Sequence, residues 1–402
     1  MILTDIRARR ENMENIRQEM TEKLTAAFQE TFGRSPEGFA CAPGRVELLG
    51  NHTDHQRGKV LAASVDLKAY AAFALNGTDT VSLVSEGHSS MKVSVKDLMP
   101  DVSEFNTAKS ILRGMLKGFY DLKAPLSGFD IYIISEVLTG SGLSSSAAFE
   151  VLLGRVLNLL FMNNSVSAIE IAKIGWIAEN RFFGKPCGLM DQAASSIGNV
   201  VFFDFEDPAG PKTEQISFDF QKAGYALCAV ACGAGHANLT ADYAAIPREM
   251  KQVASFFGKD VLREVAEEEF LANKDKIIEA LGERPYLRAL HFFEESRRAQ
   301  EAADALRAND ISRFLELANE SGISSRTQLK NIIPDSDPSE NKLDLAMRYA
   351  IDLLKGTNGA VRMNGGGFSG TFLSVVPLSS LDAFRDSIEE RLGKGAVQIL
   401  NT

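Results

Sequence analysis

The stretch Thr139-Gly140-Ser141-Gly142-Leu143-Ser144-Ser145-Ser146-Ala147-Ala148 decides how the rest of this chain is organised. Residues 129–137 before it alternate as in a strand, and residues 149–161 after it form an apolar run long enough for a buried helix. Two glycines permit a tight turn that comes close to a ligand, and three serines follow at the predicted helix start. A helix N-terminus offers unpaired N–H groups and partial positive charge, which suit a phosphate. We therefore predict a phosphate site here, and the alternative is a serine that caps the helix.

Length, composition and charge restrict the class of protein. A chain of 402 residues suggests two or three domains, and 45% hydrophobic with 24% charged residues is typical of a soluble globular protein. The net charge of −10 argues against a nucleic-acid partner bound nonspecifically. The charged N-terminus lacks a signal core and no apolar run reaches membrane-spanning length, so we expect a cytoplasmic protein without a membrane partner. Four cysteines are too few for a disulfide framework and suit a reducing compartment.

The order of the predicted elements indicates an α+β protein in two halves. Apolar residues at helical spacing predict a helix over the first thirty-odd residues, ended by Gly33, and residues 38–95 alternate as strands. Ser167 and Glu170 form a capping box for a helix that reaches about Phe183. Residues 207–211 are the strongest linker, so we predict domains at 1–210 and 211–402. The second half is rich in helices and contains a strand–glycine–strand unit at residues 360–376.

A polar cluster follows the hydrophobic strand that begins near Arg45. Residues 43–55 read PGRVELLGNHTDH. Asparagine, histidine, threonine and aspartate side chains at a strand end supply the mixed donors and acceptors that a polyhydroxylated ligand requires. Two alternatives remain open, a polar turn without a ligand and a metal site formed by His52, Asp54 and His55.

Two carboxylates and a second glycine-rich turn complete the candidates. Glu179 lies near the end of the helix after the capping box, and Asp191 follows twelve residues later within CGLMDQ. Phosphoryl transfer needs a hard cation on oxygen ligands and a group that orients the acceptor hydroxyl, and two carboxylates can divide these roles. Taken singly, each is equally well explained as a surface or capping carboxylate. Residues 363–370, MNGGGFSG, hold more glycines than a plain hairpin needs, so we predict a second wall of the phosphate site or its support.

Together, three stretches resemble the signature motifs of an enzyme family. APGRVELLGNHTDH, LTGSGLSSSAAFE and VRMNGGGFSG, in this order, resemble the three motifs of the GHMP small-molecule kinases and, within them, those of the galactokinases. The resemblance covers nearly the whole chain. It implies a two-lobed α+β fold, with a ribosomal-S5-like N-terminal domain, a C-terminal α+β domain and the active site between them. It also implies an ATP-dependent sugar 1-kinase that phosphorylates the anomeric hydroxyl of galactose and uses Mg²⁺.

The same resemblance assigns roles to individual residues. The glycine–serine stretch would bind the ATP phosphates through Gly140, Ser141, Gly142, Leu143, Ser144, Ser145 and Ser146. Ser146 and Glu179 would hold Mg²⁺. Asp191 would accept the proton of the anomeric hydroxyl, and Arg45 beside it would favour the ionised carboxylate. The sugar would be bound by Asn51, His52, Thr53, Asp54 and Tyr243.

The chain departs from the galactokinase pattern at four positions. Asn51 and His55 stand where the usual motif has Glu and Tyr, and Asn364 and Ser369 stand where Thr and Gly are common. Because asparagine is neutral and can donate as well as accept, we predict weaker galactose binding or a preference for a modified or differently configured sugar. The alternatives are a kinase for a galactosamine derivative, galacturonic acid or arabinose, and a non-catalytic sugar sensor. The oligomeric state is not fixed by the sequence, and a monomer is expected.

Overall fold

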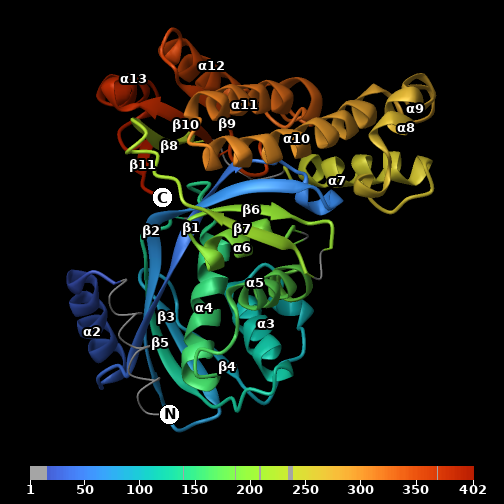
Figure 1. The fold of residues 1–402 in the computed structure, drawn as a ribbon. Helices are drawn as coiled ribbons and strands as arrows, with labels where there is room; N and C mark the ends of the chain where they lie inside the picture. The colour runs from blue at the N-terminus through green and yellow to red at the C-terminus, as the bar shows by residue number, and fades with distance from the viewer. Residues whose placement is uncertain (1–15, 139, 186, 208–209, 234–238, 369) are drawn as a thin grey trace. The chain divides into compact units, whose positions relative to one another are not determined.

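The structure, a computed structural model of the chain, describes residues 16–138, 140–185, 187–207, 210–233, 239–368 and 370–402 (Figure 1). The chain divides into two units, each discontinuous in sequence. The first comprises Met1–Arg45, Leu67–Thr139 and Ser144–Gly198, and the second comprises Val46–Asp66, Gly140–Leu143 and Asn199–Thr402. Both units contain helices and strands, which confirms the predicted α+β class. The predicted domain boundary after residue 210 stays a prediction, and the short segments 46–66 and 140–143 group with the later part of the chain.

The first unit is built on a sheet with helices on both faces (Figure 1). Its strands lie in the order β4 (Met91–Ser94), β3 (Thr80–Ser85), β5 (Phe129–Ser135) and the later part of β2 (Lys59–Leu75), and β1 (Gly38–Leu49) pairs with β2. Strands β3 and β5 are parallel, whereas β2 runs antiparallel to β5. Helix α2 (Gln18–Phe32) packs Leu24 and Phe28 into one buried cluster with Tyr70 and Ile134. Helices α3 (Ala108–Asp121), α4 (Ser145–Phe161) and α5 (Ala168–Ile177) lie on the other face, and α6 (Met190–Ile197) packs against α4 and α5.

The second unit contains an antiparallel four-stranded sheet. Its order is β11 (Val397–Leu400), β8 (Tyr225–Ala231), β10 (Thr371–Pro377) and β9 (Ala360–Met363). Helices α12 (Lys342–Leu354) and α13 (Leu381–Leu392) share a buried apolar cluster with this sheet. A second cluster joins α7 (Thr240–Phe256), α8 (Glu267–Ala272), α9 (Lys274–Leu281) and α10 (Glu283–Arg307), and α11 (Ile311–Ser324) packs on α10 and β9. The first part of β2, β6 (Val200–Asp204) and β7 (Lys212–Ile216) form the remaining ladder.

Local sequence signals agree with the structure in most places. Gly33 ends α2 in a left-handed conformation with φ 70°, which glycine adopts without steric cost. The Ser167 hydroxyl accepts a hydrogen bond from Glu170 N–H at 3.3 Å, as the capping box predicts. The helix after it winds more widely over Ala178–Phe183, where a π-helical segment replaces the last α-helical turns. Such segments are frequent at functional sites, and this one carries Glu179.

Two further expectations concern the cysteines and membranes. All four cysteines are free thiols: Cys41, Cys228 and Cys232 are buried, whereas Cys187 is partly exposed. Among the helices that the structure describes, none combines the length and apolar character needed to cross a bilayer.

Candidate active site

A charged pair in the first unit joins the end of its β1 segment to the start of α6. Arg45 donates from Nε to Asp191 Oδ1 at 2.7 Å and from Nη2 to Oδ2 at 2.6 Å, a bidentate geometry. The Arg45 side chain is 6% exposed, whereas that of Asp191 is 32% exposed, so the carboxylate is accessible and the guanidinium is not. Burial alone would raise the pKa of Asp191, but the Arg45 charge and hydrogen bonds from Arg45 and Ser144 outweigh it and hold the pKa below its usual value. Asp191 is therefore an ionised, oriented carboxylate near neutral pH.

Ser144, at the start of α4, supplies another hydrogen bond to this carboxylate. Its Oγ donates to Asp191 Oδ2 at 2.7 Å, and its backbone is left-handed with φ 58°. A non-glycine residue in this region is uncommon and is often found at functional sites. The side chain forms no capping bond to α4 within the described chain, so the alternative that Ser144 caps the helix is wrong. The hydroxyl that would have capped the helix is oriented toward Asp191.

The rest of the glycine–serine stretch is divided between the units. Gly140, Ser141, Gly142 and Leu143 group with the second unit, whereas Ser145 and Ser146 begin α4 in the first. Ser146 is exposed in the first helical turn, where N–H groups have no intrahelical acceptor. Thr139 lies outside the described residues. Binding of ATP phosphates by these residues stays a prediction.

Glu179 is buried in the π-helical segment and contacts three side chains. Its Oε1 lies 3.2 Å from Lys185 Nζ, and its Oε2 accepts from Cys187 Sγ at 3.1 Å and from Gln192 Nε2 at 2.8 Å. Gln192 Nε2 also donates to Oε2 of the fully buried Glu150 at 3.0 Å. Burial, and next the charge of Glu179, raise the pKa of Glu150 well above its ordinary value. Gln192 thus bridges two buried carboxylates and fixes the orientation of Glu179.

The chemistry of this donor set fits a magnesium ion. The Glu179 carboxylate and the Ser146 hydroxyl are hard oxygen donors, and Glu150 Oε1 is buried without a hydrogen-bond partner among the described residues. Mg²⁺ keeps several waters and takes one or two carboxylates together with substrate phosphates, so few protein ligands suffice. In the part of the chain that the structure describes, no three His, Cys, Asp or Glu side chains gather as a metal cluster. That finding removes support from the alternative metal site at His52, Asp54 and His55.

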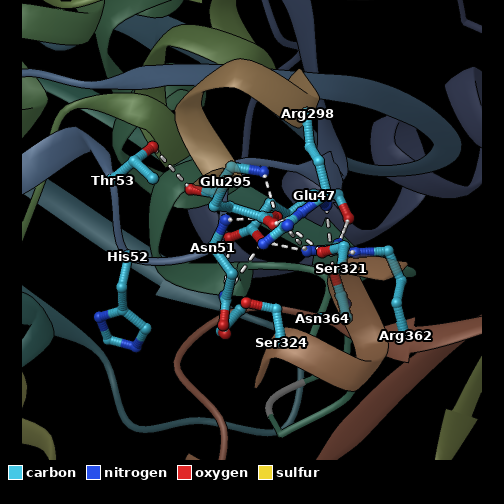
Figure 2. Close-up of polar contacts among 12 residues, drawn as sticks. Glu47, Asn51, His52, Thr53, Glu295, Arg298, Ser321, Ser324, Arg362 and Asn364 are labelled. Atoms are coloured by element: carbon cyan, nitrogen blue, oxygen red, sulfur yellow. Dashed lines mark hydrogen bonds and ion pairs between the residues drawn. The ribbon is translucent and has the colours of Figure 1, made fainter. Parts of the chain in front are cut away.

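In the second unit, residues 50–55 form the polar turn predicted to bind the sugar (Figure 2). Asn51 is 1% exposed, and its Nδ2 donates to Glu47 Oε1 at 3.0 Å and to the Gly365 carbonyl at 2.7 Å. Its Oδ1 accepts from Asn331 Nδ2 at 2.8 Å. Both polar atoms of the Asn51 side chain are thus used within the chain. This bonding favours a role in holding the turn over a direct contact with a ligand.

Two buried carboxylates anchor the polar turn (Figure 2). Glu47, 3% exposed, pairs with Arg362 Nη2 at 2.7 Å. Glu295 on α10 accepts from the Gly50 N–H at 3.0 Å and pairs with Arg298 Nε at 2.8 Å. Burial alone would raise the pKa of Glu295, but the charges of Arg298, His291 and Arg362 and a bond from Ser321 lower it to about 2. The turn therefore rests on two buried carboxylates that are each paired with an arginine.

The remaining predicted sugar ligands differ in how many of their side-chain polar atoms are hydrogen-bonded within the chain. Thr53 is fully buried and its hydroxyl lies within hydrogen-bond distance of the carbonyls of Gly50 and Lys59, so it shapes the turn. His52 Nε2 donates to the Gly366 carbonyl at 3.0 Å, and Asp54 Oδ1 accepts from the His55 N–H at 2.8 Å. Tyr243 on α7 donates from its hydroxyl to the Gly367 carbonyl at 2.7 Å. Sugar binding by these residues stays a prediction.

Sequence reasoning missed a set of supporting residues. They are Glu47, Glu150, Lys185, Gln192, His291, Glu295, Asn331 and Arg362. Gln192 and Lys185 lie inside or beside the quoted CGLMDQ stretch, so a closer look at that motif could have found them. Glu295, Asn331 and Arg362 lie hundreds of residues from the polar turn, and the fold alone brings them to it.

Two family models match the chain. Residues 26–75 match the galactokinase galactose-binding signature, and residues 106–199 match the N-terminal domain of the GHMP kinases. The first match contains the polar turn and Arg45, and the second contains Ser144, Glu179 and Asp191.

Curated relatives and solved structures are similar over almost the full length. A galactokinase of Glaesserella parasuis is 32% identical over 91% of this chain and 92% of its own length. A galactokinase of Streptomyces coelicolor is 31% identical, with 90% of each chain covered. The crystal structure of Lactococcus lactis galactokinase complexed with galactose has a TM-score of 0.81 at 25% identity, covering 95% of this chain and 98% of that one. The mevalonate kinase of Methanococcus jannaschii, at 18% identity and a TM-score of 0.61 over 90% of this chain and 96% of that one, shares the fold.

Proposed function

The chain belongs to the galactokinase family of the GHMP kinases, and on this premise we propose that it transfers the γ-phosphoryl group of ATP to the anomeric hydroxyl of galactose. The family membership also confirms the predicted two-domain GHMP kinase fold. The observation that carries the proposal is the bidentate Arg45–Asp191 pair with Ser144 on the same carboxylate. This arrangement holds an ionised carboxylate in one orientation, as a reaction that removes a hydroxyl proton requires.

In the proposed reaction, the anomeric oxygen forms a bond to the γ-phosphorus while the bond from that phosphorus to the β,γ-bridging oxygen breaks, releasing ADP. The hydroxyl proton passes to Asp191. A carboxylate with a lowered pKa is a weak base. It suffices here because phosphoryl transfer is largely dissociative, and the hydroxyl loses its proton late, as the new bond forms. Arg45 keeps Asp191 ionised and fixes its direction through two parallel hydrogen bonds.

Ser146 and Glu179 are the residues that would hold Mg²⁺, which neutralises charge on the β- and γ-phosphates when bound. The contacts from Gln192 and Lys185 support this assignment, because they keep the Glu179 carboxylate in place before any ligand arrives. In the second unit, the polar turn is proposed to bind the sugar through His52 and Asp54 with Tyr243. Asn51 and Thr53 would act by shaping the turn.

The chain is further proposed to act as a monomer in the cytoplasm. A cytoplasmic location is supported by the use of ATP as the phosphoryl donor. A reducing compartment also suits the free, buried thiols of Cys41, Cys228 and Cys232. Sizing with light scattering tests the monomer.

An ADP-release assay against a panel of free sugars tests the function. The panel holds galactose, its 2-amino and 6-carboxy derivatives, arabinose and glucose, and ³¹P NMR identifies the product. We expect galactose 1-phosphate with the largest kcat/KM. A larger value for another sugar would replace galactose as the substrate. Calorimetric sugar binding without ADP release would instead support a sugar sensor.

A further inference from the structure

The turn between β9 and β10, Asn364–Gly367, contacts both other motif segments of the second unit. Asn364 directly follows β9 and is 4% exposed. Its Oδ1 accepts a hydrogen bond from the Glu47 N–H at 3.0 Å (Figure 2), and its Nδ2 donates to the Gly142 carbonyl at 2.9 Å. Glu47 leads into the polar turn, and Gly142 lies in the glycine–serine stretch. One carboxamide therefore joins the backbones of two segments that are remote in sequence.

Neighbouring groups of the same turn tighten both contacts. The Gly365 carbonyl accepts from Asn51 Nδ2 at 2.7 Å, and the Gly366 carbonyl accepts from His52 Nε2 at 3.0 Å. On the other side, Gly142 has φ +75°, and a Cβ there would lie 2.5 Å from Thr371 Cβ at the start of β10. Neither segment can move far without moving the β9–β10 turn, because interiors packed this closely transmit displacement.

We propose that Asn364 is a positioning residue that couples nucleotide binding at the glycine–serine stretch to sugar binding at the polar turn. The inference rests on the proposed function. A carboxamide is planar, so its Nδ2 and Oδ1 turn together. A nucleotide phosphate that fixes the Gly142 backbone thereby fixes the acceptor that holds the Glu47 N–H. By reciprocity, sugar bound at the polar turn steadies the glycine–serine stretch by the same factor.

The test is a thermodynamic one. Isothermal titration calorimetry measures the Kd of a non-hydrolysable ATP analogue without and with saturating galactose, and the ratio of the two values is the coupling factor. We expect a factor of about 5 to 150 in the parent, the usual range for coupled sites. Asn364→Ala removes both bonds and should bring the factor to within about twofold of one, a much larger change than the loss in either single affinity.

Asn331→Ala is the matched control. Asn331 is also a fully buried asparagine, and its Nδ2 lies 2.8 Å from Asn51 Oδ1 and 3.2 Å from the Gly366 carbonyl. These two bonds reach the polar turn and the β9–β10 turn but not the glycine–serine stretch. Asn331→Ala should therefore weaken galactose binding and leave the coupling factor unchanged. A general loss of packing would lower the factor in both variants.

Three results overturn the inference: a parent factor of one, a parent-like factor in Asn364→Ala, or an equal loss of the factor in Asn331→Ala. If Asn364→Ala does not fold, Asn364→Ser replaces it, because the hydroxyl keeps one hydrogen-bonding group with shorter reach. An intermediate factor is then expected, and a parent-like factor again overturns the inference. Failure of the proposed function looks different, since a chain that binds no galactose at all shows no galactose heat.

Discussion

The surroundings of Asp191 in the first unit and those of Asn51 in the second are built in opposite ways. Asp191 is a partly exposed carboxylate held by two side chains, Arg45 and Ser144. Asn51 is a buried amide whose side chain is bonded to Glu47 on β1, to Asn331 and to the Gly365 carbonyl of the β9–β10 turn, and Glu47 is in turn paired with Arg362 on β9. An accessible group with few partners can exchange a proton with a ligand. A buried amide whose polar atoms are bonded within the chain is better suited to holding its neighbours in position than to exchanging a proton.

This difference separates chemistry from positioning. Replacing Asp191 by the isosteric asparagine should abolish a chemical step at a smaller structural cost, because an amide oxygen remains to accept from the buried Arg45 guanidinium. Removing a member of the Asn51 network should leave buried polar groups without partners, which costs stability first and ligand affinity second.

Asp191→Asn tests the chemical role most directly. Positioned general bases contribute about 10²–10⁴-fold, so kcat should fall by about that much while the ATP analogue and galactose still bind. The control is Asp130→Asn, which neutralises another carboxylate paired with an arginine, since Arg34 Nη2 lies 2.7 Å from Asp130 Oδ2. That variant should keep near-parent kcat. Near-normal turnover in Asp191→Asn would exclude the assigned role.

Arg362→Met tests whether the second network serves the polar turn. It leaves the buried Glu47 carboxylate without its ion-pair partner, and breaking a buried pair typically costs about 3–5 kcal/mol. We expect a drop of that order in the free energy of unfolding by urea, and a higher KM for galactose under conditions in which circular dichroism shows the variant to be folded.

Arg113→Met provides the comparison for Arg362→Met. Arg113 pairs with Glu104 through Nε and Nη2, each at 2.8 Å, and both residues are buried in the first unit. This variant should lose stability without a change in the KM for galactose. If both variants raise that KM equally, the Glu47–Arg362 pair has no special relation to sugar binding.

The two regions differ in how much of them the sequence predicts, because one depends on short motifs and the other on contacts between distant residues. Asp191, Arg45 and the serines lie in short motifs whose spacing carries chemistry, and the α+β class follows from the periodicity of β5, α4 and β10. The orientation of Ser144 toward Asp191 was not predicted. The same serine at a helix start can either cap the helix or bond to another side chain, and the sequence does not distinguish the two. Glu295 and Arg362 look like ordinary charged residues of a helix and a strand. Their burial depends on contacts with residues far away in the sequence, which a local sequence pattern cannot predict.

Exchanging the two residues of the Glu47–Asn51 pair tests whether residue 51 determines which sugar is bound. Asn51→Glu alone places a second carboxylate beside Glu47 and removes two donors, so it should destabilise the chain. Adding Glu47→Asn restores one carboxylate and one amide, and we expect recovery of about 0.5–3 kcal/mol, the range for coupled neighbours.

The kcat/KM ratios across galactose, its 2-amino and 6-carboxy derivatives, and arabinose then decide the role of position 51. Because both polar atoms of Asn51 are bonded within the chain, we expect these ratios to agree within about twofold between the parent and the exchanged variant. A shift toward galactose of about five- to a hundred-fold, equivalent to about 1–3 kcal/mol, would instead support the sequence-based prediction that residue 51 contacts the sugar.

The smallest effect concerns pH and the two histidines of the polar turn. The Gly366 carbonyl can only accept, so His52 carries its proton on Nε2, and its Nδ1 accepts from His55 Nε2 at 3.3 Å. His55 Nδ1 is left to accept from Gln56 Nε2 at 3.4 Å. A further proton on either ring would place two hydrogen-bond donors against each other with no acceptor between them. Burial is the main cause that lowers the pKa of His52 to about 4 and that of His55 to about 3.

The sign of the resulting pH dependence follows from proton counts. Between pH 6.5 and 4 the unfolded chain binds protons on these rings and the folded chain does not, so stability falls as the pH drops through that window. The free energy of unfolding, measured by urea titration from pH 7 to 5, should therefore decrease on acidification. His55→Tyr removes one titrating ring and should reduce the slope by close to one proton, about 1.4 kcal/mol per pH unit. If the free energy of unfolding has the same slope against pH in His55→Tyr and in the parent, burial does not keep the His55 ring neutral.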